Sequence, residues 1–165
     1  MAVLFWLCIV LAAVIDRVTK MLAERFVLGK TEVIKIGELD VLFFNITHNT
    51  GAAFSSFSGK TAMLSVFTVA ALIVMVVYFY RTKSKGRLKT ISMGMIVGGG
   101  LGNLYDRIAF GRVTDFINLF PFNFVFNFAD ICVVLGAVLL MIVMLFLEKE
   151  TGTDGEDGEK EAENG

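Results

Sequence analysis

The stretch FNFADICVVLG, residues 126–136, places an aspartate, Asp130, at the start of a strongly apolar run. A second stretch, GRVTDFINLF at residues 111–120, places Asp115 in similar surroundings. An aspartate at the centre of a membrane-spanning helix costs about 2.5–3.5 kcal/mol. The chain keeps two aspartates beside apolar runs, one on each side of a single connecting segment, and this pattern needs a chemical explanation.

The composition predicts a membrane protein. Of the 165 residues, 56% are hydrophobic and 19% are charged, and the mean hydropathy is +0.72. Soluble domains average roughly 45–50% apolar and about 25% charged residues. The apolar residues form four runs, each close to the ~20 residues that cross a bilayer. These runs extend from Ala2 to about Met21, from about Thr61 to Tyr80, from about Ile91 to Phe110, and from near Asp130 to Leu147.

The segment after Leu147 has a different composition. It holds eight of the 16 acidic residues, only two lysines and no apolar periodicity. We therefore predict a four-span membrane domain at residues 1–147 and a disordered acidic tail at 148–165. The first run lacks a basic start and a small-residue cleavage site, so we expect an uncleaved span. Cys8 and Cys132 lie in apolar runs and are interpreted as small hydrophobic residues rather than a disulfide.

The segment RTKSKGRLK, residues 81–89, sets the predicted topology. It has five basic residues and no acid, and short basic loops stay in the cytoplasm. Both termini are then cytoplasmic, and the loops at 26–60 and 111–128 face outward. In the first loop, TEVIKI and LDVLFFNITH predict short strands. The second contains Pro121 and several aromatic residues suited to the membrane interface.

The third run is rich in glycine. Gly94, Gly98 and Gly102 recur every four residues and share one helix face, which predicts close packing against a neighbouring helix. A phosphate-binding loop is not indicated, because the required lysine is missing.

Polar residues gather at the outward ends of the predicted spans. Such a concentration at one depth predicts a functional site. The group comprises Asp16, Lys20, Asn103, Asp106, Arg107, Asn127 and Asp130, with Asp115 nearby.

Structural roles remain open for several of these residues. Asp16 and Lys20 are four apart and can form an ion pair, while Asp106 can pair with Arg107 or Arg112. For Asp16 and Asp106 the structural interpretation is the stronger one.

Asn127 can cap the fourth span, which would put Asp130 in the first turn, where the helix dipole favours a carboxylate. This alternative and a catalytic role for Asp130 are evenly balanced. Asp115 has no comparable structural role, although a loop aspartate is often a turn residue.

Other catalytic groups are poorly supported. His48 is the only histidine and has no evident nucleophile partner, and no His/Cys cluster has metal-ligand spacing. Ser56 or Ser58 could pair with Lys60, but nothing there would lower the pKa of that lysine. A carboxylate pair remains: two close carboxylates share a proton, so that one acts as a base and the other as an acid.

Two other classes of function fit the sequence less well. Acids within spans often mark proton relays or transporters, but here they lie at the membrane edge, and no inverted repeat is evident. A scaffold that packs through its glycine face would leave the two aspartates unexplained.

Five motifs in order give a resemblance to the bacterial type II signal peptidases, over nearly all of residues 1–147. They are DRVTK, NTGAAFS, GGGLGNLYDR, GRVTDFI and FNFADICVVLG. The resemblance implies an all-α membrane protein, a four-transmembrane-helix bundle with a small outward-facing β-sheet and a flap from the first loop. It also implies an aspartic endopeptidase of the bacterial cytoplasmic membrane that cleaves diacylglyceryl-modified prolipoproteins before the lipidated cysteine.

The resemblance assigns the catalytic pair to Asp115 and Asp130. It also implies that a second group of residues lines or supports the site, namely Asp16, Lys20, Asn49, Asn103, Arg107, Asn127 and Ala129. To these we add Gly51, a small residue expected near the substrate, and Asp106. We expect prolipoprotein substrates and membrane lipids as partners, a monomer, no metal, no organic cofactor and no nucleic acid.

Overall fold

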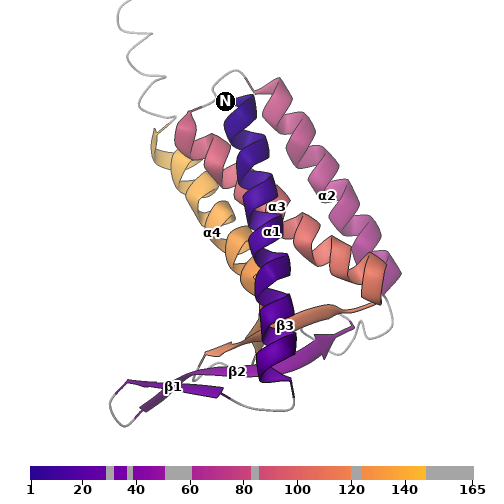
Figure 1. The fold of residues 1–165 in the computed structure, drawn as a ribbon. Coiled ribbons are helices and arrows are strands. Elements are labelled where there is room, and N and C mark those ends of the chain that lie inside the picture. The colour runs from indigo at the N-terminus through magenta and orange to yellow at the C-terminus, as the bar shows by residue number, and fades with distance from the viewer. Residues whose placement is uncertain (29–31, 37–38, 51–60, 83–85, 120–123, 148–165) are drawn as a thin grey trace, which may run out of the picture.

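The protein is a helix bundle with a small sheet across one end (Figure 1). The computed structural model describes the chain except for residues 29–31, 37–38, 51–60, 83–85, 120–123 and 148–165. The helices are α1 (Ala2–Val27), α2 (Thr61–Arg81), α3 (Arg87–Phe110) and α4 (Phe128–Ile142), which continues as a π-helical turn at Val143–Leu147. The predicted tail and flap fall outside the described residues.

Among the described residues, three helices are long and apolar enough to cross a membrane: α1, α2 and the segment Phe128–Phe146. α3 has 24 residues, which at 1.5 Å per residue is also long enough, but its glycines and polar residues make it less apolar. The predicted four-helix bundle is confirmed. α1 ends at Val27 rather than near Met21, because its last turns are tied to the sheet through Glu24, which accepts a hydrogen bond from Thr114 Oγ1 at 3.0 Å.

The glycine face of α3 packs against α1, as the spacing predicts. A Cβ added at Gly94 would lie 2.6 Å from Cys8 Cβ, and one at Gly98 would lie 2.6 Å from Ala12 Cβ. One at Gly102 would lie 2.5 Å from Asp16 Oδ2. Glycine is therefore required for the two helices to approach this closely along three successive turns.

The sheet has four antiparallel strands in the order β1-β2-β3-β4. β1 (Glu32–Ile36) and β2 (Leu39–Asn49) are the strands predicted in the first loop. β3 (Val113–Leu119) and β4 (Val125–Phe126) come from the second outward loop, for which the sequence predicted no strands. β2 supplies β3 with a pairing edge that no local pattern reveals.

The far end of the bundle is held by aromatic contacts between α1 and α2. The rings of Phe5 and Phe79 stack with centroids 3.9 Å apart, and Trp6 Nε1 donates to Tyr80 Oη at 3.0 Å. Cys8 and Cys132 are both free thiols, as predicted. These contacts hold one end of the bundle together and leave the polar residues at the sheet end.

Candidate active site

Asp130 is positioned by the start of α4. Asn127 is the N-cap residue: its Oδ1 accepts from the Asp130 N–H at 3.0 Å, and Asp130 Oδ2 accepts from the Asn127 N–H at 3.2 Å. This reciprocal capping box confirms the predicted cap. The capping box fixes both side chains relative to the helix. Asp130 can therefore stabilise the start of α4 and still present its carboxylate in a defined position.

Asp115 reaches the same place from the sheet. It lies on β3 opposite Thr47 and is 3% exposed. Its Oδ1 accepts from Asn127 Nδ2 at 2.6 Å. Asn127 thus bonds both carboxylates, that of Asp115 through its side-chain NH₂ group and that of Asp130 through its backbone N–H. We call Asp115 and Asp130 the dyad.

Amide groups surround the dyad. Asn49 Nδ2 donates to Asp115 Oδ2 at 3.0 Å, and Asn103 Nδ2 donates to Asp130 Oδ1 at 2.7 Å. Asn127 supplies two more donors, its backbone N–H and its Nδ2. Each of the four carboxylate oxygens of the dyad therefore accepts one N–H hydrogen bond. These donors orient both carboxylates without adding a positive charge beside them.

The direction of these amides is determined by their other partners. Asn103 Oδ1 accepts from Lys20 Nζ at 3.0 Å and from Asn127 Nδ2 at 3.1 Å. An ammonium group can only donate, so the Asn103 oxygen must face Lys20, and its NH₂ group must face Asp130. The Asn127 oxygen is likewise occupied by the Asp130 N–H, which leaves its NH₂ group for Asp115.

A second charged group lies next to the dyad and is here called the ion cluster. It comprises Asp16, Arg17, Lys20 and Asp106. Lys20 Nζ lies 2.8 Å from Asp16 Oδ2 and 2.9 Å from Asp106 Oδ2, and Lys20 is completely buried. Arg17 Nη1 lies 3.1 Å from Asp106 Oδ1. The two cations balance the two carboxylates, which makes the burial of Asp16, Lys20 and Asp106 tolerable, while Arg17 remains partly exposed.

The ion cluster holds the elements that carry the dyad. Asp16 Oδ1 accepts from the Ala129 N–H at 2.9 Å and so holds the N-terminus of α4. Asp106 Oδ2 accepts from the Thr114 N–H at 3.2 Å and so holds the start of β3. Each carboxylate of the cluster thus fixes the residue that immediately precedes one member of the dyad.

Burial changes the acidity of Asp115. Removal from water raises the pKa of Asp115 from 3.8 to about 6, and the nearby charge of Asp130 adds to this increase. Hydrogen bonds from Asn49 and Asn127 and the charge of Lys20 oppose it. Near neutral pH, Asp115 can therefore take up or release a proton, which is the property needed of an acid–base group.

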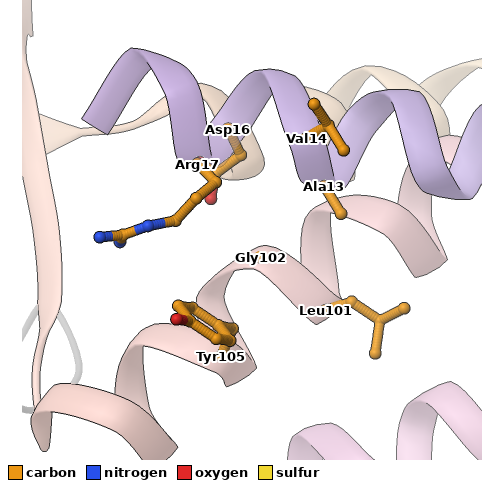
Figure 2. Close-up of a pocket in the computed structure, with 7 residues that line it drawn as sticks. All are labelled: Ala13, Val14, Asp16, Arg17, Leu101, Gly102 and Tyr105. Carbon is orange, nitrogen blue, oxygen red and sulfur yellow. The ribbon is translucent and has the colours of Figure 1, made fainter. Parts of the chain in front are cut away.

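Hollows between the helices adjoin this region. One of about 310 Å³ lies between α2, α3 and α4, and Asn103, Arg107 and Asp130 line it. Another, of about 370 Å³, lies between α1 and α3 (Figure 2). There Arg17 extends beside the ring of Tyr105, with its Cζ 5.4 Å from the ring centroid. The first hollow reaches the dyad, whereas the lining of the second contains neither member of it.

The predicted site residues have different outcomes. Asp16 and Lys20 form the expected ion pair, but the expected pairing of Asp106 with Arg107 or Arg112 was wrong, because Asp106 is bonded to two cations on α1. Arg107 Nη1 instead donates to the Asn103 carbonyl at 3.4 Å.

His48 lies exposed on β2. Gly51, Ser56, Ser58 and Lys60 lie outside the described residues. Among the residues that the structure does describe, no group of three His, Cys, Asp or Glu side chains is arranged to hold a metal ion.

Two contributors were missed from the sequence. Arg17 follows Asp16 in DRVTK. An arginine inside an apolar run indicates that an acidic side chain lies nearby to pair with it. Thr114, which bonds both α1 and α3, gave no comparable signal, because its contacts depend on the position of β3.

The fold and site define a class: a multi-pass membrane protein with two aspartates brought together at one end of a helix bundle. The sequence profile of signal peptidase II matches residues 8–146, and the chain belongs to that protease family.

Similar proteins include the lipoprotein signal peptidase of Clostridium acetobutylicum, 36% identical over 90% of this chain and 97% of that protein. The lipoprotein signal peptidase of Desulfitobacterium hafniense is 39% identical over 89% of this chain and 96% of that protein. A solved bacterial membrane enzyme, 29% identical, superimposes with a TM-score of 0.74 and covers 85% of this chain and 91% of that one.

Proposed function

We propose that the protein is a membrane aspartic endopeptidase that removes signal peptides from diacylglyceryl-modified prolipoproteins, cutting before the lipidated cysteine. The observation that carries the proposal is the placement of Asp115 and Asp130 on either side of Asn127, with an N–H donor to each carboxylate oxygen. The family and the names of its lipoprotein signal peptidase members support the choice of substrate.

The two carboxylates divide the acid and base roles. Asp115 holds the shared proton, as the raised pKa of its carboxyl group near 6 supports, and Asp130 acts as the base. Asp130 takes a proton from a water molecule, whose oxygen attacks the scissile carbonyl carbon. Asp115 donates its proton to the carbonyl oxygen. When the tetrahedral intermediate collapses, one of its hydroxyl groups returns a proton to Asp115 as the C=O bond re-forms. The carbon–nitrogen bond breaks, and the proton held by Asp130 passes to the leaving amine of the cysteine, which restores the dyad.

The remaining predicted residues position this reaction. Asn49, Asn103 and Asn127 orient the dyad through the hydrogen bonds described above. Arg107 lines the hollow beside Asp130 and is placed to bind a peptide carbonyl or a lipid head group. The group that holds the surrounding elements comprises Asp16, Lys20, Asp106 and Ala129.

The topology follows from the basic loop. With residues 81–89 in the cytoplasm, both termini are cytoplasmic and the sheet end faces outward. The dyad then lies at the outward surface of the cytoplasmic membrane, where the cleavage site of a translocated prolipoprotein is accessible.

The test is direct cleavage. Purified full-length protein is incubated with a diacylglyceryl-modified prolipoprotein, and mass spectrometry detects the signal peptide and the new amino-terminal cysteine. The unmodified precursor is the control and should remain intact. Absence of the released peptide, or equal cleavage of both precursors, would contradict the proposal.

A further inference from the structure

Asp130 lies between two pockets. The helix-side pocket is the hollow of about 310 Å³ between α2, α3 and α4. The strand-side pocket, of about 340 Å³, lies between α4 and the strands β3 and β4. Asp130 and Val134 line both pockets, so these two residues of α4 form a shared wall.

The two linings have different chemistry. The helix-side pocket presents Thr68, Asn103 and Arg107, which can bond the N–H and C=O groups of a peptide. Apart from Asp130, the described residues that line the strand-side pocket are all apolar: Leu119, Phe124, Phe126, Ile131, Val134 and Leu135. A peptide backbone buried there would lose its hydrogen bonds with water without replacement, whereas a hydrocarbon chain has none to lose.

The strand-side pocket opens on the outer surface of the bundle, which the proposed membrane topology places against lipid. Its rim residues Phe124, Val134 and Leu135 are 54%, 59% and 49% exposed. A chain already dissolved in the bilayer can therefore enter it sideways. Such a chain moves from one apolar environment to another, so it gains no free energy of transfer from water. The pocket instead binds it through van der Waals packing and fixes its position.

We propose that the strand-side pocket binds an acyl chain of the diacylglyceryl group on the substrate cysteine, while the peptide occupies the helix-side pocket. This inference rests on the proposed function. The bond to be cut joins the signal peptide to the lipidated cysteine. Placing the two parts in pockets on opposite sides of Asp130 brings that bond to the dyad.

The experiment compares two substrates with one peptide sequence. In one, the glyceryl group on the cysteine carries two palmitoyl chains, and in the other two acetyl groups, which are too short to fill the pocket. Leu135→Trp fills the strand-side pocket from α4. Val138→Trp is the matched control, because Val138 is similarly exposed at 43% and lies in neither lining.

The wild-type protein and Val138→Trp should prefer the palmitoyl substrate by roughly tenfold or more in kcat/KM, the discrimination that a shaped apolar pocket provides. Leu135→Trp should reduce this ratio to near one without slowing the acetyl substrate. If Leu135→Trp does not fold, Ile131→Phe fills the same pocket and should act likewise.

An unchanged ratio in the pocket variants would mean that the pocket holds only bilayer lipid, and would overturn the inference. An equal loss for both substrates would also overturn it, since the pocket would then act on the dyad. Cleavage of neither substrate by the wild-type protein would instead refute the proposed function.

Discussion

Two pairs of aspartates lie at the same end of the bundle and differ in what they are bonded to. Asp16 and Asp106 are paired with the cations Arg17 and Lys20. Asp115 and Asp130 receive their hydrogen bonds from the neutral amides of Asn49, Asn103 and Asn127 and from a backbone N–H. The pairs are adjacent, because Asn103 bonds both Lys20 and Asp130.

The difference in partners separates structure from chemistry. A cation in contact with a buried carboxylate offsets the cost of burying its charge and fixes its position. Neutral amide donors also orient a carboxylate, but they oppose its protonation less than a neighbouring cation does. The cation-bound pair is thus suited to hold α4 and β3 in place, and the amide-bound pair to exchange protons.

The largest expected effect is on the amide-bound pair. Asp115→Asn and Asp130→Asn should each lower the rate of prolipoprotein cleavage by roughly 10²–10⁴-fold, because each removes a positioned acid or base. The double variant should be little worse than either single one, since the two groups act as a unit. Folding should survive, because asparagine keeps the shape of the side chain.

The control for the dyad is Asp154→Asn in the acidic tail, which should cleave at the wild-type rate. Rates are compared at equal amounts of folded protein. Full activity in either dyad variant would show that both aspartate pairs are structural.

The cation-bound pair should respond in the opposite way, through stability. Lys20→Met leaves Asp16 and Asp106 buried with one cation fewer, and breaking a buried ion pair costs about 3–5 kcal/mol. Thermal unfolding in detergent measures this loss. Lys20→Met combined with Asp16→Asn removes one charge of each sign and should regain most of the stability.

The same double variant also tests the link between the two pairs. Without the ammonium group, the Asn103 oxygen keeps only the hydrogen bond from Asn127 Nδ2 at 3.1 Å. Asn103 is then held less firmly against Asp130, so cleavage should stay impaired although the protein is folded. Normal cleavage by the double variant would show that the orientation of Asn103 does not depend on Lys20.

The sequence predicted the elements that depend on local pattern. The helices follow from apolar runs, β1 and β2 from alternation, and the start of α4 from Asn127 followed by Asp130 three residues later. The convergence of polar residues at one end followed from the topology. These features can be predicted without knowing which helices and strands are in contact.

Partners across elements could not be predicted in the same way. Asp106 has arginines nearby in sequence, yet it is bonded to Lys20 and Arg17 of α1, because the glycine face of α3 brings the two helices together. β3 likewise exists because β2 is there to pair with it. Both facts depend on tertiary packing rather than on local spacing.

The raised pKa of Asp115 predicts how the stability of the protein depends on pH, which tests the proton-exchanging role of the amide-bound pair. With its pKa raised to about 6, the native protein keeps this proton at pH values where the unfolded chain has lost it. This stabilisation is complete below about pH 4 and is lost as pH rises through about 6, a change of ~3 kcal/mol. Asp115→Asn should remove that part of the pH dependence of thermal unfolding.

Activity should follow the same group. Cleavage by the wild-type protein should fall as pH rises through about 6, because Asp115 then loses the proton that it donates. Activity that instead rises through this range would reverse the assigned roles of Asp115 and Asp130.

The smallest expected effect concerns the glycine beside the ion cluster. In Gly102→Ala the new Cβ would lie 2.5 Å from Asp16 Oδ2 and 3.0 Å from its Cγ, so the carboxylate must move away from Lys20 and from the N-terminus of α4. Overpacking of this kind costs about 1–3 kcal/mol. Gly86→Ala is the control, because a Cβ there meets nothing within 4 Å. Thermal unfolding should separate the two variants, and equal stability would mean that the Asp16 carboxylate can shift without loosening the contact between α1 and α4.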